Sequence, residues 1–157
     1  MGKLDQAVTA EGPTAMAARN QMGALCWRMR GSRPQVLLIT SRDTGRWVIP
    51  KGWPMAHLAA RDAALREAWE EAGVEGTGSG PALGFFAYRK ALADRSSVPC
   101  VVEVFPVRVD RLADRYPEKG QRRRKWFSPE KAAKKVAEPE LRTLILRFAP
   151  ASSEDGA

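Results

Sequence analysis

The chain has few of the features that mark secreted or membrane-bound proteins. Its 157 residues include two cysteines and one histidine, and no apolar run reaches the roughly 20 residues that a membrane-spanning helix needs. The N-terminal segment has no apolar core of the kind found in secretory signals, and Gln6 stands where N-myristoylation requires Ser or Thr. We therefore expect a cytoplasmic protein without membrane contact, in which Cys26 and Cys100 are buried free thiols.

The length and composition predict one globular domain. Hydrophobic residues make up 44% and charged residues 28% of the chain, which is typical of soluble proteins with a packed core. Residues 1–20 are rich in alanine, glycine and polar side chains, and residues 150–157 end in a polar stretch. We expect a flexible arm over 1–20, a single domain over 21–149 and a disordered tail over 150–157.

The charge balance is strongly basic. There are 26 basic and 18 acidic residues, a net charge of +8, and the segment 119–125 alone carries five cations in seven positions. Such an excess favours anionic partners, for example phosphorylated small molecules or RNA. An ordinary solvated charged surface explains the same numbers, so charge alone does not decide between them.

Hydrophobic periodicity predicts a mixed α/β sandwich of the α+β class. In residues 24–30 apolar and cationic side chains alternate, as in a half-buried strand. Glycine, proline and serine clusters separate the segments, and "GTGSGP" (76–81) is interpreted as a loop. The expected strands are 24–30, 35–40, 46–50, 83–92 and 98–109 (the last two as a hairpin) and 125–127, and the expected helices are 59–72, 129–136 and a third from 139.

The helix expected over 59–72 gathers three acidic residues on one side. At 100° per residue, Glu67, Glu70 and Glu71 fall within about 100° of arc. The opposite side, expected to pack on the sheet, carries Leu65, Ala68, Trp69 and Ala72. Like charges at this spacing repel each other, and the chain as a whole is basic. A divalent cation would remove the repulsion, and Mg²⁺ prefers carboxylate ligands and bridges to phosphates. The alternative is an exposed acidic helix face without a ligand.

At these residues the sequence resembles the Nudix hydrolase family. The family's motif is G-x5-E-x7-R-E-U-x-E-E-x-G-U, where U is apolar; Gly52 opens it here and "REAWEEAGV" (66–74) completes it at the family's spacing. One position departs from the motif, because Leu58 replaces the first Glu, which puts the number of bound metal ions in question. The segments "VLLITSRDTGRWVIPKG" and "GQRRRKWF" resemble the branch that hydrolyses diphosphoinositol polyphosphates and diadenosine polyphosphates.

The resemblance implies a fold, a reaction and roles for individual residues. It implies a Nudix-type α/β/α sandwich with a mixed sheet, and hydrolysis of a phosphoanhydride by in-line attack of water with Mg²⁺ or Mn²⁺ as the cofactor. Glu70 and Glu71 are expected to be metal ligands, and Glu67 is either a ligand or the general base. Further roles fall to Arg66, which is expected to hold Glu70, to the Gly52 backbone carbonyl as a ligand, and to Glu118 as an extra ligand or base or simply a solvated loop residue.

Several cations are candidates for binding the phosphates of the substrate. For each of them, a surface position without function is equally compatible with the sequence. The candidates are Arg28, Arg30, Arg46, Lys51, Arg89, Arg123 and Arg124. His57 is expected at the surface or on the substrate side rather than on a metal, and Trp53 is a candidate for stacking on a base.

The cation excess favours substrates longer than a diphosphate, such as dinucleoside polyphosphates or diphosphoinositol polyphosphates. The alternatives are hydrolysis of ADP-ribose or another nucleoside-diphosphate sugar, hydrolysis at the 5′ end of RNA, and a non-catalytic nucleotide- or RNA-binding domain that keeps the fold. The segment 119–125 and the missing Glu at position 58 are compatible with the last of these, whereas Arg66 and the three carboxylates favour an enzyme. The oligomeric state does not follow from the sequence.

Overall fold

The computed structural model describes residues 18–150, so most of the predicted arm and tail lies outside the described residues. Strand β1 begins at Arg19, two residues before the expected start of the domain. The elements in chain order are β1 Arg19–Arg30, β2 Arg33–Thr40, β3 Trp47–Val48, β4 Lys51–Gly52, α1 Ala60–Ala72, β5 Val74–Gly78, β6 Gly84–Ala91, β7 Ser97–Leu112, β8 Arg124–Phe127, α2 Pro129–Lys135 and α3 Pro139–Arg147.

The strands form one mixed sheet. Its main path runs β3-β2-β1-β7-β5, while β4 pairs with β1, β6 with β7 and β8 with β2. The central β1 and β7 are parallel, in a register that pairs Gly23 with Val104, and the other pairings are antiparallel. The predicted hairpin of residues 83–92 and 98–109 is confirmed as β6 and β7.

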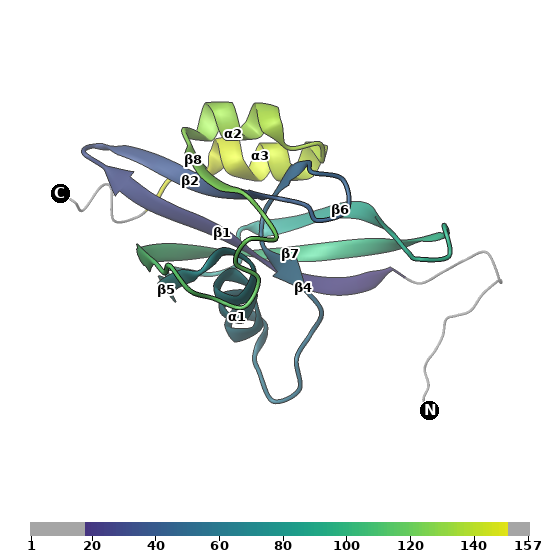
Figure 1. The fold of residues 1–157 in the computed structure, drawn as a ribbon. Helices are drawn as coiled ribbons and strands as arrows, with labels where there is room; N and C mark the ends of the chain where they lie inside the picture. The colour runs from purple at the N-terminus through teal and green to yellow at the C-terminus, as the bar shows by residue number, and fades with distance from the viewer. Residues whose placement is uncertain (1–17, 151–157) are drawn as a thin grey trace.

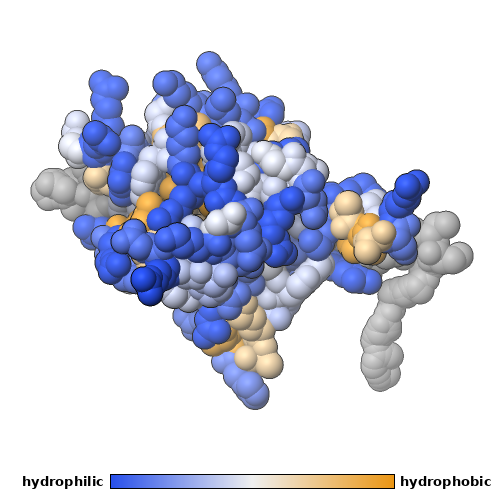
Figure 2. All heavy atoms as spheres, in the orientation of Figure 1, coloured by the Kyte–Doolittle hydropathy of each residue, from blue (hydrophilic) through white to orange (hydrophobic). Residues whose placement is uncertain are grey.

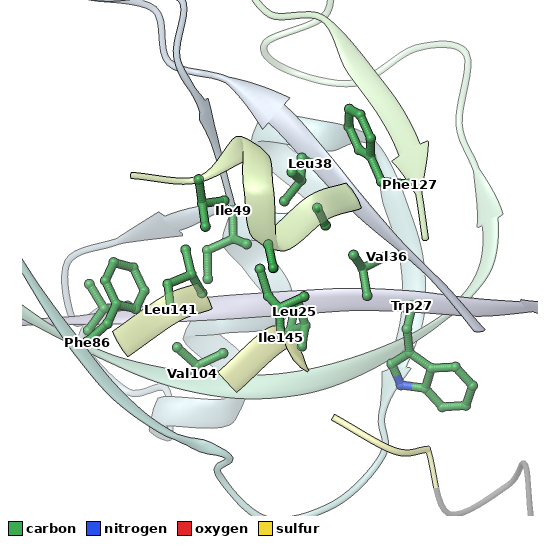
Figure 3. Close-up of a cluster of buried hydrophobic side chains, with 14 residues drawn as sticks. Leu25, Trp27, Val36, Leu38, Ile49, Phe86, Val104, Phe127, Leu141 and Ile145 are labelled. Carbon is green, nitrogen blue, oxygen red and sulfur yellow. The ribbon is translucent and has the colours of Figure 1, made fainter. Parts of the chain in front are cut away.

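Helices cover both faces of the sheet, with α2 and α3 on one face and α1 on the other (Figure 1). On the first face Leu141 and Ile145 of α3 pack with Leu25 of β1 (Figure 3). On the second face Ala64 and Ala68 of α1 pack against the sheet. The predicted α/β/α sandwich with a mixed sheet is therefore confirmed.

Successive side chains of β1 point to opposite faces of the sheet, so this strand contributes to the hydrophobic cores on both faces. Leu25 and Trp27 belong to the core under α2 and α3, whereas Ala24 and Cys26 belong to the core under α1. Cys26 and Cys100 are both buried free thiols, as predicted.

The sequence interpretation missed two strands, the short β4, which follows the expected strand 46–50, and β5. Residues 74–78 were expected to lead into a loop, but they form β5, which pairs with the end of β7 and has a register shift between Glu75 and Gly76. Gly76 is needed there because a side chain would collide with the backbone oxygen of Arg108. Gly76 thus suggests a loop in the sequence but is required by close packing within the sheet, whereas Gly78 lies against the Arg61 side chain of α1.

The surface seen in Figure 2 is dominated by hydrophilic side chains, with apolar ones in small separate patches. Within residues 18–150, none of the helices has the length and hydropathy needed to cross a lipid bilayer.

Candidate active site

The site is built around helix α1, whose end is fixed by glycine. Gly73 has a φ of 68°, in the left-handed region, and its N–H donates to the Trp69 carbonyl oxygen at 2.9 Å. This is the geometry by which glycine ends helices. Because the chain leaves α1 directly into β5, the helix is held tightly against the sheet, and the carboxylate-bearing turn has a fixed orientation.

Two of the predicted carboxylates are buried rather than turned away from the sheet. Glu67 and Glu71 lie one turn apart, each is 9% exposed, and their side chains are hydrogen-bonded to each other. Burial raises the pKa of both groups, and that of Glu71 reaches about 8, although Arg122 lowers it and Glu67 raises it further. The expectation that the acidic side of the helix faces away from the sheet is therefore wrong for these two residues.

Gly52 gives Glu67 its space. A Cβ atom at position 52 would collide with the Glu67 carboxylate, so only glycine fits beside it. The backbone N–H of the preceding residue, Lys51, donates to Glu71 Oε1 at 3.3 Å. Strand β4 thus runs directly against the buried carboxylate pair, and the role of the Gly52 carbonyl as a metal ligand stays a prediction.

Glu70 lies outside this pair. It is partly exposed, and its Oε2 is 4.0 Å from Arg66 Nη1, which agrees with the predicted Arg66–Glu70 ion pair. Glu118 lies nearby, because its N–H donates to the Glu70 carbonyl oxygen at 3.0 Å. Within residues 18–150, no three Asp, Glu, His or Cys side chains are arranged as a ready metal-binding group. The structure therefore brings together two of the three predicted carboxylates and places Glu70 at their edge.

Arg122 is the cation at the centre of the site, and the sequence interpretation did not single it out. It is 3.7 Å from Glu71 Oε2 and 3.0 Å from Glu118 Oε1, and it donates to the Thr40 carbonyl oxygen at 3.2 Å. Its side chain is only 11% exposed. It therefore supplies positive charge to the buried carboxylates.

A cleft of about 230 Å³ opens over the carboxylate pair. Its cations include the predicted Lys51 and three others, Arg42, Lys90 and Arg122. The complete lining is Gln21, Ser41, Arg42, Asp43, Val48, Lys51, Gly52, Trp53, Glu67, Glu71, Tyr88, Lys90 and Arg122. Carboxylates thus lie at the base of a cleft that also carries four cations.

Arg28 and Arg30 are not part of this cleft. They lie toward the end of β1, and Arg28 is seven residues beyond the cleft residue Gln21, or about 23 Å along a strand. The Arg28 guanidinium group stacks on Trp126 at 4.1 Å from the ring centroid and donates to Gln35. The two arginines share a strand face, as predicted, but that face does not lead to the site.

The remaining predicted cations do not line the cleft, and each of them contacts a residue elsewhere. Arg46 pairs with Glu138 at 3.3 Å, and Arg89 donates to Ser97 Oγ at 2.9 Å. Arg123 stacks on Trp47, with its Cζ atom 5.2 Å from the ring centroid. Arg124 donates to the carbonyl oxygens of Ala72 and Ala113, at 2.7 and 2.9 Å, and so joins the end of α1 to the chain after β7.

Trp53 is the aromatic residue at the edge of the cleft. It is 38% exposed and has no ring contact, hydrogen bond or ion pair within residues 18–150. The other four tryptophans, Trp27, Trp47, Trp69 and Trp126, all contact a ring or a guanidinium group. His57 lies in the same loop with a φ of 67°, and it does not line the cleft.

Comparison with known proteins places this arrangement in a family. The NUDIX domain model matches residues 19–148, which is most of the chain. The chain belongs to the Nudix family. Nudix relatives include mouse diphosphoinositol polyphosphate phosphohydrolase 3-alpha, which is 30% identical over 118 residues, covering 74% of this chain and 68% of the mouse protein. Another is Nudix hydrolase 21, chloroplastic, of Arabidopsis thaliana, 30% identical over 134 residues, or 83% of this chain and 66% of the plant protein.

Solved structures show the same Nudix fold. The Ap4A hydrolase of C. elegans superposes with a TM-score of 0.61 at 18% identity, covering 84% of this chain and 96% of that one. A NUDIX hydrolase from Nitrosomonas europaea gives a TM-score of 0.61 at 20% identity, covering 83% and 87%. At these identities the structural similarity concerns the fold. The family match and the 30%-identical relatives identify the chain as a phosphoanhydride-cleaving enzyme of the Nudix type.

Proposed function

We propose that the protein is a Mg²⁺-dependent pyrophosphohydrolase of highly phosphorylated small molecules, either dinucleoside polyphosphates or diphosphoinositol polyphosphates. The observation that carries the proposal is the buried Glu67–Glu71 pair at the base of a cleft with four cations. Relatives whose names refer to diphosphoinositol polyphosphates and to Ap4A support this choice of substrates. We propose a cytoplasmic setting, in which the free thiols of Cys26 and Cys100 remain reduced.

The residues present fit a divalent ion. Two buried carboxyl groups with raised pKa values, packed against a glycine that leaves room for oxygen ligands, are hard ligands of the kind that Mg²⁺ and Mn²⁺ prefer. Glu67, Glu71 and the Gly52 carbonyl would hold the ion, with Glu70 at the edge and Glu118 as a further candidate. When bound, the ion would activate water and neutralise phosphate charge. Glu67 is a ligand or the general base, and Arg66 holds Glu70 in place.

The cations of the cleft would bind the phosphate chain. Lys51, Lys90 and Arg42 line the cleft together with Arg122, which also neutralises Glu71. A chain of several phosphates carries more negative charge for these four cations to neutralise than a diphosphate does. This is why we favour long polyphosphates over ADP-ribose or a nucleoside-diphosphate sugar. Hydrolysis of the 5′ end of RNA, and RNA binding without catalysis, are the alternatives that the experiment must separate.

The test is hydrolysis of a panel of substrates with Mg²⁺, followed by ion-exchange separation of the substrates from their phosphorylated products, comparing wild type with Glu71→Gln. The panel contains diadenosine tetra- and hexaphosphate, a diphosphoinositol polyphosphate, ADP-ribose and 5′-triphosphorylated RNA. We expect the polyphosphates to be cleaved far faster than ADP-ribose, and expect Glu71→Gln to slow cleavage by about two orders of magnitude or more. If no member is cleaved and RNA binds with a steep dependence on salt, the chain is a binding module instead.

A further inference from the structure

Thr40 is a buried polar residue to which the proposed reaction gives no role. It is the last residue of β2, it is 8% exposed, and it does not line the cleft. Its N–H donates to the Arg123 carbonyl oxygen at 3.0 Å, and its Oγ1 accepts from the Arg123 N–H at 2.9 Å. Its carbonyl oxygen accepts from Arg122 Nη1 at 3.2 Å. All three polar atoms of Thr40 thus bond to the start of the arginine run.

The Thr40 hydroxyl takes the place of a backbone acceptor at the end of the sheet. Strands β2 and β8 are antiparallel with Ile39 opposite Arg124, so Thr40 comes opposite Arg123. In a regular hydrogen-bonded pair of this kind, the two residues exchange both N–H to carbonyl bonds. Here only the Thr40 N–H follows that pattern, because the Arg123 N–H bonds to the hydroxyl instead. The Thr40 carbonyl oxygen is left to the Arg122 guanidinium group.

The Arg122 guanidinium group is fixed by three separate segments of the chain. Its Nε donates to Glu118 Oε1 at 3.0 Å, its Nη1 donates to Thr40, and its Nη2 lies 3.7 Å from Glu71 Oε2. The side chain is 11% exposed and lines the cleft. A cation that is already ordered loses little conformational entropy when an anion binds to it. The direction of this guanidinium group therefore matters for the cleft.

Stabilisation of the sheet is the alternative explanation for the Thr40 hydroxyl. Removing a hydroxyl that satisfies a backbone N–H lowers stability wherever it occurs, without any effect that depends on one other side chain. A positioning role differs in one respect, because the consequences of losing the hydroxyl then depend on Arg122.

We propose that Thr40 is a positioning residue, whose hydroxyl binds the Arg123 N–H so that its carbonyl oxygen holds the Arg122 guanidinium group at the cleft. This bond also accounts for the one arginine of the run that reaches the cleft, since it fixes the Arg123 backbone and the Arg122 side chain together. The effect on substrate rests on the proposed function, because it assumes that Arg122 binds phosphate.

The position of Arg122 can be observed directly by nuclear magnetic resonance. Its Nε–H bonds to a carboxylate at low exposure, so it should give a separate signal that exchanges slowly with water. The signal is identified by its absence from Arg122→Met. Thr40→Val keeps a β-branched side chain without the hydroxyl, and we expect it to speed this exchange about tenfold or more. Thr40→Ser, which keeps the hydroxyl, should restore slow exchange. Unchanged exchange in Thr40→Val would overturn the proposal.

A double-mutant cycle tests the consequence for anion binding. Calorimetry with inorganic tripolyphosphate in EDTA, and the KM for diadenosine hexaphosphate with Mg²⁺, are measured for wild type, Thr40→Val, Arg122→Met and the double variant. We expect Thr40→Val to weaken tripolyphosphate binding and to raise KM, each about fivefold, and Thr40→Ser to stay near wild type. In the Arg122→Met background, Thr40→Val should have almost no further effect. If the two effects multiply, Thr40 acts independently of Arg122 and the proposal is overturned.

A strand threonine elsewhere serves as the matched control. Thr77 is exposed on β5, and its Oγ1 donates to Asp110 Oδ2 at 3.4 Å. Thr77→Val should leave the Arg122 signal and tripolyphosphate binding unchanged; a loss equal to that of Thr40→Val would overturn the proposal. If Thr40→Val does not fold, Thr40→Ala replaces it, and its loss of binding must again depend on Arg122. If wild type cleaves no polyphosphate, the proposed function fails, while the Arg122 signal still decides the role of Thr40.

Discussion

At the scale of single residues, the Glu67–Glu71 pair determines how the site behaves without metal. Two carboxyl groups in contact at low exposure cannot both ionise easily, so the pair retains a proton at neutral pH. Arg122 offsets part of this cost through its ion pair with Glu71. A divalent ion would replace that proton.

The first prediction concerns stability against pH. The pKa of Glu71 in the folded protein, about 8, lies above its ordinary value of 4.5, so the folded state holds more protons than the unfolded state between these values. The contribution of this group to stability is therefore present below about pH 4.5 and is lost as the pH rises to about 8. Urea unfolding in EDTA should show this decline, and Glu71→Gln should flatten it. An unchanged pH dependence in the variant would show that Glu71 ionises normally.

The second prediction concerns turnover. Glu71→Gln and Glu70→Gln keep side-chain volume but remove a carboxylate, so each should lower kcat by about two orders of magnitude or more without unfolding the protein. Steady-state kinetics with Mg²⁺, together with thermal unfolding, measure both quantities. If both variants retain wild-type activity, these residues do not belong to a metal site.

The third prediction concerns Trp53, whose indole is exposed at the edge of the cleft. If the indole stacks on a base, Trp53→Ala should raise KM for dinucleoside polyphosphates about tenfold, in line with stacking on nucleobases. It should leave KM for a diphosphoinositol polyphosphate nearly unchanged. Competition kinetics with both substrates measure the difference. Equal effects on the two would exclude a base-stacking role.

Some site residues could be predicted from the sequence and others could not, because side-chain direction depends on strand register. The resemblance to the Nudix motif identified Gly52, and helix periodicity grouped the three carboxylates of α1 on one side. In the run of three arginines from 122 to 124, only Arg122 reaches the cleft, while Arg124 binds the end of α1. Because the three residues are all arginines, their side chains alone do not indicate which one points into the cleft. The same applies in β6, where Lys90 lines the cleft and its neighbour Arg89 bonds to Ser97.

At the scale of elements, the site depends on the short connection between α1 and β5, which consists of Gly73 alone. Helices and strands with clear periodicity, such as β1 and α3, could be predicted from the sequence. β5 could not, because Gly76, which suggests a loop, is required there by the close approach of β7. The burial of Glu67 and Glu71 was also beyond the helical pattern, since it arises from β4 and from the Arg122 segment lying against α1.

The fourth prediction tests the connection between α1 and β5 at Gly73. Gly73→Ala should lower the free energy of unfolding by about 1 to 3 kcal/mol, because Gly73 has a positive φ and a Cβ would meet the Tyr116 ring. Gly45→Ala is the control, since Gly45 has a similar φ of 73° but open space around it. Urea unfolding of both variants separates the cost of the contacts with Tyr116 and Arg124 from the cost of the positive φ. If Gly45→Ala costs as much as Gly73→Ala, packing against Tyr116 contributes nothing.

At the scale of the whole molecule, the sandwich brings distant segments to one cleft. β1, β4 and β6, the turn after β2, helix α1 and the segment before β8 all contribute to its lining. The net charge of +8 adds attraction for anionic substrates over longer distances. The central claim is that α1 holds a divalent ion beside these cations.

The most direct measurement of that claim is Mn²⁺ binding followed by electron paramagnetic resonance, in the presence of a non-hydrolysable dinucleoside polyphosphate. We compare wild type with the double variant Glu67→Gln and Glu71→Gln, after checking that both are folded. Wild type should bind Mn²⁺ at millimolar concentration or below, with proton release between pH 6 and 8, and the double variant should bind at least about tenfold more weakly. Equal Mn²⁺ binding by the two proteins would contradict a metal site on α1.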